Sequence, residues 1–423
     1  MANKPSEHNF WASRKRQDAA TSLILYIIAW AGALIFVIPL VWMVTTSLKT
    51  PTEVFTMPPK WIPISAVTVD YPTSIVSHED GYVRFERIGE RRIVNLLRVR
   101  GSKNPDDFLK TYNIPEVASV TVTDNQRIKG GDEIAKIPRS GTVDIIENFD
   151  KSRTFRVLDR RDRVIYQVPI PAGTNMKVKT GDVVQVGERV GTIPPQWRNY
   201  AEAWAPKALN ETFNRYLLNT IFITVMGIIG VLFSSSFVAY GFARFKFPGR
   251  DPLFLVMIST MMIPVQVTMI PTFILFKYLG WIDTFAPLIV PTFFGGGAFN
   301  IFLMRQFFMT IPYELDDAAK IDGCNYFQIF AIILMPLVKP ALATIAIFGF
   351  VYNWNDFLNP LIYLNSSSNY TLALGLQVFT TMYGSYYHLM MAASTIVLLP
   401  ILIVFFLGQR YFIEGVATSG LKG

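Results

Sequence analysis

Few side chains in this chain of 423 residues have the types and spacing that catalysis or metal binding requires. Its three histidines are scattered, at His8, His78 and His388, and Cys324 is its only cysteine, so neither a metal cluster nor an intrachain disulfide is expected. The patterns GxxxxGK[ST], GxSxG and HExxH are all absent, which excludes the usual ATP phosphate cradle, serine nucleophile and zinc protease site. The sequence therefore predicts a protein that is not an enzyme and that has no cofactor, metal or nucleotide site of its own.

One acidic residue, Asp356 in YNWNDFLNP, belongs to a long apolar stretch. A carboxylate within a membrane is a functional hypothesis by default, although at the end of a span a capping or interfacial role explains it equally well. A lone carboxylate is a poor basis for a proton-coupled carrier, which usually needs a relay of titratable groups. We therefore assign Asp356 no transport chemistry.

A short polar segment, ELDDAAKIDGCNYF from Glu314 to Phe327, lies between two long apolar runs. Its acidic side chains fall in the first turns of an expected helix, where the helix dipole favours negative charge. Gly323 can adopt a positive φ and end that helix, and Asn325 can cap a second helix that ends near Pro336. Ala318 and Ala319 give the first helix a smooth face, suited either to a partner protein or to packing on the chain's own bundle.

These elements belong to a membrane protein by composition. Hydrophobic residues make up 51% of the chain and charged residues only 17%, and the mean hydropathy is +0.33. Crossing a bilayer takes roughly 20 apolar residues per helix. Six stretches qualify, and we expect them to form an all-α bundle of six transmembrane helices, at about 22–46, 216–240, 253–276, 285–308, 337–363 and 389–412.

Lysine and arginine beside the spans predict the orientation, because they concentrate in cytoplasmic loops. The loops that would share one side contain more basic residues than those on the other side. We therefore expect a multi-pass protein of the cell membrane with both termini cytoplasmic, namely an N-terminus over 1–21 and a tail over 413–423.

The segment 64–198 differs from the rest and lies between the first two spans. It holds 22 of the 39 Lys and Arg residues and 18 of the 31 Asp and Glu residues. Alternation in FRVLDRRDRVIYQVPI and glycine turns in KVKTGDVVQVGERVGTI indicate strands. The second string resembles the turn of barrel-sandwich folds such as biotinyl and lipoyl domains, but the glycines follow Lys177 too closely for a modified lysine. We expect an inserted extracytoplasmic β-rich domain over 64–198, after a first helix and exit segment over 22–63.

The string DDAAKIDGCNYFQIFAIILMPLVKP resembles the EAA loop of the permease subunits of ABC importers. That pattern is E-A-A, three residues, G, nine residues and I-x-L-P. Its places are taken here by Asp317, Ala318, Ala319, Gly323, Ile333, Met335 and Pro336, with Asp for Glu and Met for Leu as conservative departures. PPKWIP, NRYLLNTIFIT, ARFKFPGRD, NWNDFLNPLIY and FIEGVATSGLKG are similar to the carbohydrate-uptake, maltose-type branch. The similarity covers nearly the whole chain except the insert.

The resemblance implies a permease that couples ATP hydrolysis by a partner to alternating access for a sugar. Its partners would be a second permease subunit, a cytoplasmic ABC ATPase dimer and an extracytoplasmic sugar-binding protein, all within membrane lipid and without nucleic acid. The region 199–412 would hold helices two to six, with a cytoplasmic coupling loop over 309–336. The residues expected to dock on the ATPase are Glu314, Asp317, Ala318, Ala319, Gly323 and Pro336.

The substrate path is expected to combine aromatic faces with amides, as sugar sites usually do. The candidates are Asn300, Tyr352, Asn353, Trp354 and Asn355. Three other functions stay open: an ABC permease for another solute, a membrane-anchored sensor that uses its external β-domain, and a secondary carrier. The coupling loop argues against a sensor, and the missing ion relay argues against a carrier.

Overall fold

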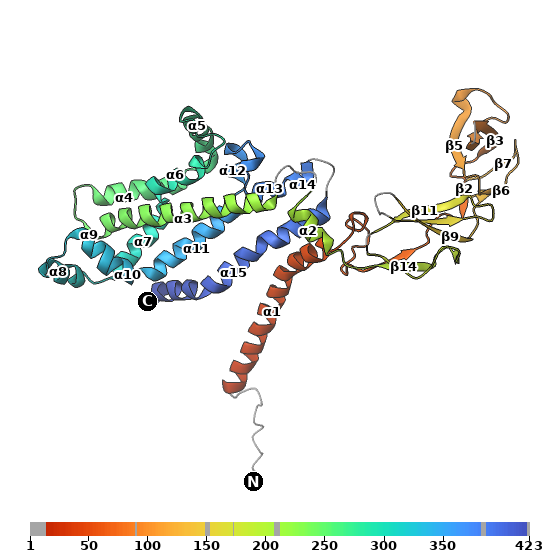
Figure 1. Cartoon of the computed structure of the whole chain (residues 1–423). Coiled ribbons are helices and arrows are strands. Elements are labelled where there is room, and N and C mark those ends of the chain that lie inside the picture. The colour runs from red at the N-terminus through yellow and green to blue at the C-terminus, as the bar shows by residue number, and fades with distance from the viewer. Residues whose placement is uncertain are drawn as a thin grey trace, which may run out of the picture. The chain divides into compact units, whose positions relative to one another are not determined.

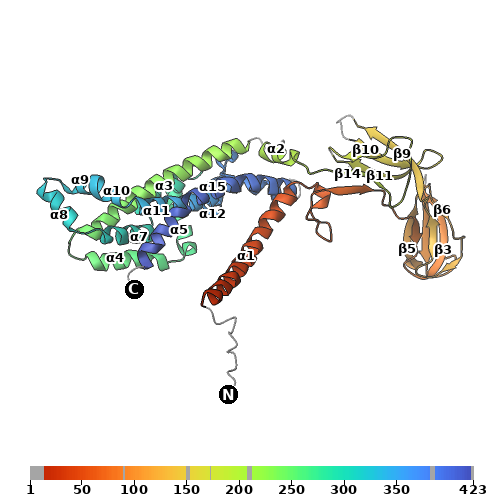
Figure 2. The ribbon, with the colours of Figure 1, turned by 90° about the horizontal axis from the view of Figure 1, so that it is seen from below.

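The computed structural model describes residues 14–88, 91–148, 153–171, 173–206, 212–381 and 386–420. It divides into a helical unit, made of Met1–Ser47 with Trp197–Gly423, and a β-rich unit, Leu48–Gln196 (Figures 1 and 2). Residues 1–13 of the expected N-terminus and 421–423 of the expected tail lie outside the described residues.

Four stretches of the helical unit are long and apolar enough to cross a membrane: Thr21–Ser47, Phe213–Arg244, Ala286–Thr310 and Tyr387–Gln409. The first lies in α1 (Arg14–Ser47), the second is α3, and the last lies in α15 (Tyr387–Gly420). The third consists of α6 (Ala286–Gly295) and α7 (Ala298–Thr310), which are separated by Gly296 and Gly297. Both glycines have a positive φ, which ends one helix and lets the next begin, so the stretch expected at 285–308 is broken in two.

Two further apolar stretches are bent. Arg250–Met262 and α5 (Val265–Tyr278) meet at 97°, and Tyr326–Leu337 and α11 (Lys339–Asn355) meet at 77°. Each pair is long enough for a span only when both halves are counted together. The stretch expected at 253–276 is therefore not straight, because Pro264 has extended backbone and no N–H to continue a helix. The stretch expected at 337–363 likewise ends its main helix at Asn355, and a short α12 (Leu358–Tyr363) follows.

Small residues let α3 approach α6 and α11 closely. A Cβ on Gly230 would lie 2.1 Å from Thr292 Oγ1, and a Cβ on Gly227 would lie 3.2 Å from the amide of Asn353. Ser234 Oγ donates a hydrogen bond of 2.7 Å to the Thr292 carbonyl, which joins α3 to α6. Small residues are the usual means of close helix contact in a membrane, where lipid gives no hydrophobic drive to association.

The β-rich unit contains four small sheets, with strand orders β1-β14-β12, β11-β10-β9-β13, β2-β8-β6 and β5-β4-β3-β7. All of the strand pairs are antiparallel. The strands are β1 Ser65–Thr68, β2 Ser74–Val76, β3 Gly81–Ile88, β4 Arg91–Leu97, β5 Phe108–Ile114, β6 Ser119–Val120, β7 Arg127–Ile128, β8 Glu133–Lys136, β9 Ser140–Glu147, β10 Arg153–Leu158, β11 Val164–Ile170, β12 Asn175–Met176, β13 Val183–Gln185 and β14 Arg189–Ile193. The strands that alternation indicated in FRVLDRRDRVIYQVPI are present as β10 and β11, which pair as a hairpin.

The four sheets form two lobes of the same topology, one nested inside the other. The order β5-β4-β3-β7 becomes β11-β10-β9-β13 when every strand number is raised by six. The two three-stranded sheets also correspond. In one sheet β8 lies between β2 and β6, and in the other β14 lies between β1 and β12. One lobe is therefore β2 to β8, and it is inserted in the other lobe between β1 and β9.

The strand registers agree between the lobes at the level of single residues. Ser119 pairs with Lys136 in one lobe. Adding 56 to each of these residue numbers gives the pair of Asn175 with Thr192 in the other lobe. The register shifts between Ile75 and Val76 against β8, and it shifts at the matching place in β1 against β14. A matching shift also occurs in both long hairpins, β4 with β5 and β10 with β11. The two lobes are an internal duplication.

Four turns of one design complete the duplicated lobes, at 123–126, 129–132, 179–182 and 185–188. In each turn the side chain of the fourth residue accepts a hydrogen bond from the backbone N–H of the first residue. Asp132 accepts in this way from Lys129, and Asp182 accepts from Lys179, both at 2.8 Å. The third residue always has a positive φ, and it is Asn125 in the first turn and glycine in the others. The predicted glycine turns at Gly181 and Gly187 are therefore present.

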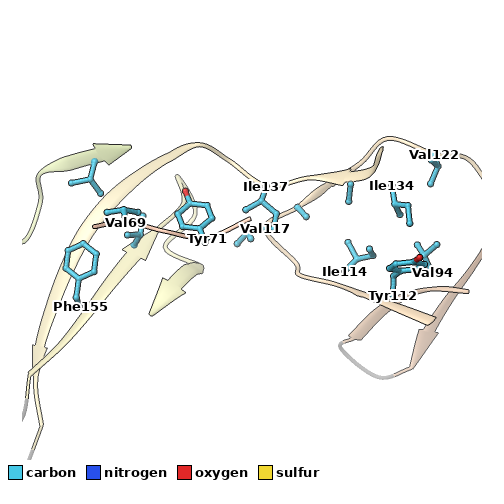
Figure 3. Close-up of a cluster of buried hydrophobic side chains, with 14 of the residues drawn as sticks. Val69, Tyr71, Val94, Tyr112, Ile114, Val117, Val122, Ile134, Ile137 and Phe155 are labelled. Atoms are coloured by element: carbon cyan, nitrogen blue, oxygen red, sulfur yellow. The ribbon is translucent and has the colours of Figure 1, made fainter. Parts of the chain in front are cut away.

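One buried cluster lies beneath the strands of both lobes (Figure 3). Val94, Tyr112 and Ile134 belong to one lobe, and Val69 and Phe155 belong to the other. The shared cluster makes the β-rich unit a single body in spite of its duplicated topology.

The chain enters and leaves the β-rich unit at one point. The N–H of Gln196 donates to the carbonyl of Leu48 at 2.8 Å, and β1 pairs with β14 just beyond. In the helical unit, Ser47 at the end of α1 contacts α2 (Arg198–Trp204). Its carbonyl accepts from Asn199 Nδ2 and its hydroxyl lies 2.8 Å from that of Tyr200.

Candidate functional site

The polar segment after α7 folds as two short helices joined at a glycine. The first is α8 (Glu314–Ile321), and Gly323 follows with a φ of 84°. Asn325 and Gln328 then cap α9 (Tyr326–Gln328) reciprocally, since each side chain accepts a hydrogen bond from the other's backbone N–H. The predicted helix, its glycine end and its Asn325 cap are thereby confirmed. A π-helical turn over Ile329–Leu334 and α10 (Met335–Leu337) complete the loop, and Pro336 is exposed.

The predicted docking residues of α8 occupy different faces of that helix. Glu314, Asp317 and Ala318 are exposed, and Ile321 is 87% exposed beside them. Asp317 accepts from Lys320 Nζ at 3.0 Å, and this hydrogen bond raises the pKa of the lysine. Ala319 is instead only 4% exposed and packs on the bundle. The free face of α8 thus combines acidic side chains with an apolar centre.

The opposite face of α8 carries a buried ion pair that the sequence did not reveal. Asp316 Oδ2 lies 3.2 Å from Nε of Arg244, and their side chains are 8% and 2% exposed. The guanidinium also donates to the Ile311 carbonyl at 3.0 Å and lies 4.4 Å from the centre of the Tyr313 ring. Burial raises the pKa of the Asp316 carboxyl, and the positive charge of Arg244 opposes that rise. Because 72 positions separate the partners, no local pattern could have found them.

A cavity of about 440 Å³ lies where α6 breaks from α7, beside α3 and α11. Its lining includes the glycines of the break, Phe348, and three of the five predicted substrate residues: Asn300, Tyr352 and Asn353. The amides of both asparagines donate to the carbonyl four residues earlier, at 2.8 Å. Among the described residues no group donates to either Oδ1, so two acceptors remain for a ligand.

The other two predicted substrate residues lie elsewhere. Trp354 is buried, stacks on Phe350 and donates from its indole to the Val397 carbonyl at 3.1 Å. Asn355 is exposed and donates to the Val351 carbonyl. Neither lines the cavity.

An acidic residue anchors the loop that follows α12. Asp283, with a φ of 62°, accepts from the backbone N–H groups of Asn365 and Ser366 at 3.0 and 2.9 Å, from the Ser366 hydroxyl, and from Asn369 Nδ2. These hydrogen bonds, led by those from Ser366, lower the pKa of the Asp283 carboxyl to about 2. The loop then continues into α13 (Leu372–Leu376) and α14 (Val378–Thr381).

The part of the chain that the structure describes contains no cluster of three or more His, Cys, Asp or Glu residues able to hold a metal ion. Lys177 directly follows β12, and its backbone N–H donates to the Val190 carbonyl. Because β12 and β13 belong to different sheets, Lys177 is not at the tip of a hairpin, where a modified lysine would be expected.

Comparison with known proteins places the helical unit among transport proteins. The sequence pattern of the family described as "Binding-protein-dependent transport system inner membrane component" matches residues 230–418. "Arabinooligosaccharides transport system permease protein AraQ" of Halalkalibacterium halodurans is 38% identical over 205 residues, which are 48% of this chain and 73% of that protein. "sn-glycerol-3-phosphate transport system permease protein UgpE" of Yersinia pestis is 33% identical over 230 residues, which are 53% of this chain and 81% of that protein.

A solved structure also overlaps the chain: "Crystal structure of a bacterial ABC transporter involved in the import of the acidic polysaccharide alginate". It is 28% identical, covers 52% of this chain and 81% of its own, and has a TM-score of 0.45.

Proposed function

Since the chain belongs to the family of binding-protein-dependent transport system inner membrane components, we propose that it is the permease subunit of an ATP-driven sugar importer. In this role it forms half of a membrane pore and moves a carbohydrate that a binding protein delivers. A cytoplasmic ATPase dimer supplies the energy, because this sequence has no phosphate-binding loop of its own.

The proposed topology has six spans, with both bent pairs counted as spans and both termini in the cytoplasm. The preponderance of Lys and Arg beside alternate spans supports this orientation. It places the β-rich unit outside the cell membrane and the loop 309–336 inside, where an ATPase is available.

The observation that carries the proposal is the free face of α8. A partner interface usually combines an apolar centre with a polar rim. Ile321 and Ala318 supply the centre here, and Glu314 and Asp317 supply the rim. Because this helix is held from its other face by the Arg244–Asp316 pair, it presents a preformed surface to the ATPase.

The cavity at the α6–α7 break is the proposed substrate path. It offers Oδ1 acceptors from Asn300 and Asn353 and ring surface from Tyr352 and Phe348, a combination that suits the hydroxyls and apolar face of a sugar. Its lining includes no charged residue, which favours a neutral sugar over a phosphorylated or acidic solute. An ABC permease for such a solute is the second candidate, supported by the printed name of the glycerol-3-phosphate relative.

The experiment is a co-purification. The tagged chain is expressed with the transport genes that neighbour its own, extracted in detergent and examined for a bound ATPase. We expect one ATPase to copurify with the wild type and to be lost on Ile321→Glu, which places a charge at the centre of the α8 face. Gly323→Glu should also release it, through strain at a positive φ. Lys246→Glu is the control, because Lys246 is exposed, lies outside α8 and follows Arg244 by only two positions.

Absence of any ATPase from correctly inserted wild type would refute the proposal. The remaining alternative, a membrane-anchored sensor that uses the β-rich unit, would then be favoured, because a sensor needs no ATPase.

The β-rich unit is proposed to contact the binding protein or the partner permease. Because its entry and exit strands pair, residues 65–193 can be replaced by a short Gly-Ser link. Unchanged transport and unchanged affinity for the binding protein after this deletion would refute such a contact.

A further inference from the structure

The helix α3 differs from the other long apolar stretches because it is one continuous helix without a proline. It runs over 32 residues, or about 48 Å at 1.5 Å per residue. Helices α1 and α15 each enclose a proline, α6 and α7 are separated by two glycines, and the two remaining pairs are bent. Of the described spans, α3 is the one best built to move as a rigid rod.

The C-terminal end of α3 holds the α8 loop from both sides. The Arg244 guanidinium pairs with Asp316 and donates to Ile311, which precedes α8. The carbonyl of Ala243 accepts from the Tyr313 hydroxyl at 2.8 Å. Tyr240 donates its hydroxyl hydrogen to the carbonyl of Tyr326, which follows α8, at 3.1 Å. A displacement of α8 therefore has to move this end of α3.

The N-terminal end of α3 holds the loop that follows α12. Asn219 Nδ2 donates to the carbonyls of Ser368 and Tyr370, at 2.8 and 3.0 Å. Thr220 Oγ1 accepts from the N–H of Leu372, the first residue of α13, at 2.8 Å. Asn219 and Thr220 are only 5% and 2% exposed, so water does not compete for these contacts.

Between its two ends α3 borders the cavity. Val231 lines it, and Gly227 and Gly230 bring the helix against Asn353 and Thr292 without intervening side chains. One rigid element thus contacts the α8 loop, the cavity and the loop of residues 365–376.

We propose that α3 is the lever that transmits the position of α8 to the loop of residues 365–376, with Arg244, Asp316 and Asn219 as its positioning residues. The inference rests on the proposed function, in which α8 docks on an ATPase and the six-span topology puts that loop on the outer side of the membrane, where a binding protein delivers the sugar. Coupling of this kind needs an element whose position both sites bias, and α3 is bonded to both.

The ion pair leaves some of its polar atoms without hydrogen bonds. Arg244 Nη1 and Asp316 Oδ1 are buried and have no hydrogen-bond partner among the described residues. A buried polar atom without a partner is costly, and Arg244 Nε also lacks a hydrogen bond, so the pair is not fully satisfied in this position of α8.

The test uses the complete transporter in lipid nanodiscs: this chain, its partner permease, the ATPase and the binding protein. The variants are the double substitution Arg244→Gln with Asp316→Asn, which leaves no lone buried charge, and Asn219→Ala at the opposite end. Arg250→Gln is the control, because Arg250 pairs with Asp251 at the surface near the same end of α3. ATPase activity is measured with and without the sugar-loaded binding protein, together with the recovery of the assembled complex.

We expect Asn219→Ala to assemble and to keep basal ATPase activity, and we expect both test variants to lose stimulation by the binding protein by about tenfold, an ordinary size for an allosteric coupling. Arg250→Gln should keep full stimulation. Full stimulation in either test variant would overturn the lever. If the double variant fails to assemble, Asn219→Ala decides alone, because Asn219 is remote from α8. Failure of the wild type to bind any ATPase would instead refute the proposed function.

Discussion

Gly230 on α3 and Thr292 on α6 lie so close together that a Cβ on the glycine would be 2.1 Å from the threonine Oγ1. No real Cβ contact is that short, so the helix separation here depends on the missing side chain. The hydrogen bond from Ser234 to the Thr292 carbonyl, one turn along α3, requires the same separation.

Substitution Gly230→Ala is therefore expected to force α3 and α6 apart. Overpacking of this kind typically costs about 1–3 kcal/mol. Gly241→Ala is the matched control on the same helix, because a Cβ at Gly241 meets nothing within 4 Å. Thermal unfolding in detergent should show a lower midpoint for the first variant and an equal or higher one for the second. Equal midpoints for the two variants would contradict the close packing.

Substitution Asn300→Ala is expected to slow transport without unfolding the protein. It removes one of the two unused Oδ1 acceptors in the cavity, and a hydrogen bond of this kind is worth about 1–1.5 kcal/mol, or roughly tenfold in rate. Asn355→Ala removes an exposed amide that does not line the cavity and should leave the rate unchanged. Sugar uptake into proteoliposomes measures both. Equal rates for the two variants would remove Asn300 from the substrate path.

The Asp283 anchor is expected to depend on pH. Because the folded pKa of about 2 lies below the ordinary 3.8, the anchor contributes its full stability above pH 3.8 and loses it as the pH falls through about 2. Hydrogen exchange at the amides of Asn365 and Ser366, corrected for the intrinsic rate, should therefore accelerate over that range. Asp283→Asn should exchange rapidly at every pH. Protection that persists below pH 2 would show that another group holds the loop.

Matched turns in the two lobes are expected to respond equally to substitution. Gly131 and Gly187 have φ values of 99° and 88°, and a Cβ at either meets nothing within 4 Å. Alanine at each should cost about 1–2 kcal/mol through the backbone alone. Exchange at the N–H groups of Ser77 and Val69, which bond to these turns, measures the opening free energy in each lobe. Costs that differ by more than about 1 kcal/mol would show that the lobes are not energetically equivalent.

The features that sequence reasoning predicted well are local ones. The bounds of α8, the positive φ of Gly323 and the cap at Asn325 depend on residues within one or two turns of each other. Glycine spacing likewise predicted the turns at Gly181 and Gly187 without reference to the rest of the chain.

Features that depend on which face of a helix points inward were harder to predict. Consecutive residues on a helix differ by about 100° in direction, so the run from Tyr352 to Asn355 could not all line one cavity. Tyr352 and Asn353 face the cavity, while Trp354 packs in the core. The Arg244–Asp316 pair joins segments 72 positions apart, and a single sequence has no signal for it. The nested lobes do leave a signal that the strand pattern alone did not use, because GDEIAKIP at 131–138 and GERVGTIP at 187–194 share a glycine, an acidic residue and Ile-Pro at a spacing of 56.

The hydrogen bond between Gln196 and Leu48 joins the two ends of the long insertion, so the insertion adds little loop-closure entropy to the cost of folding the bundle. That entropy grows only with the logarithm of loop length, by about 0.6 kcal/mol per doubling. Once the β-rich unit has folded, even this cost disappears, because α1 and α2 are then tethered as if by a tight turn. The membrane helices can therefore assemble as they would around a short connection, and the size of the β-rich unit is free to change without any change in the bundle.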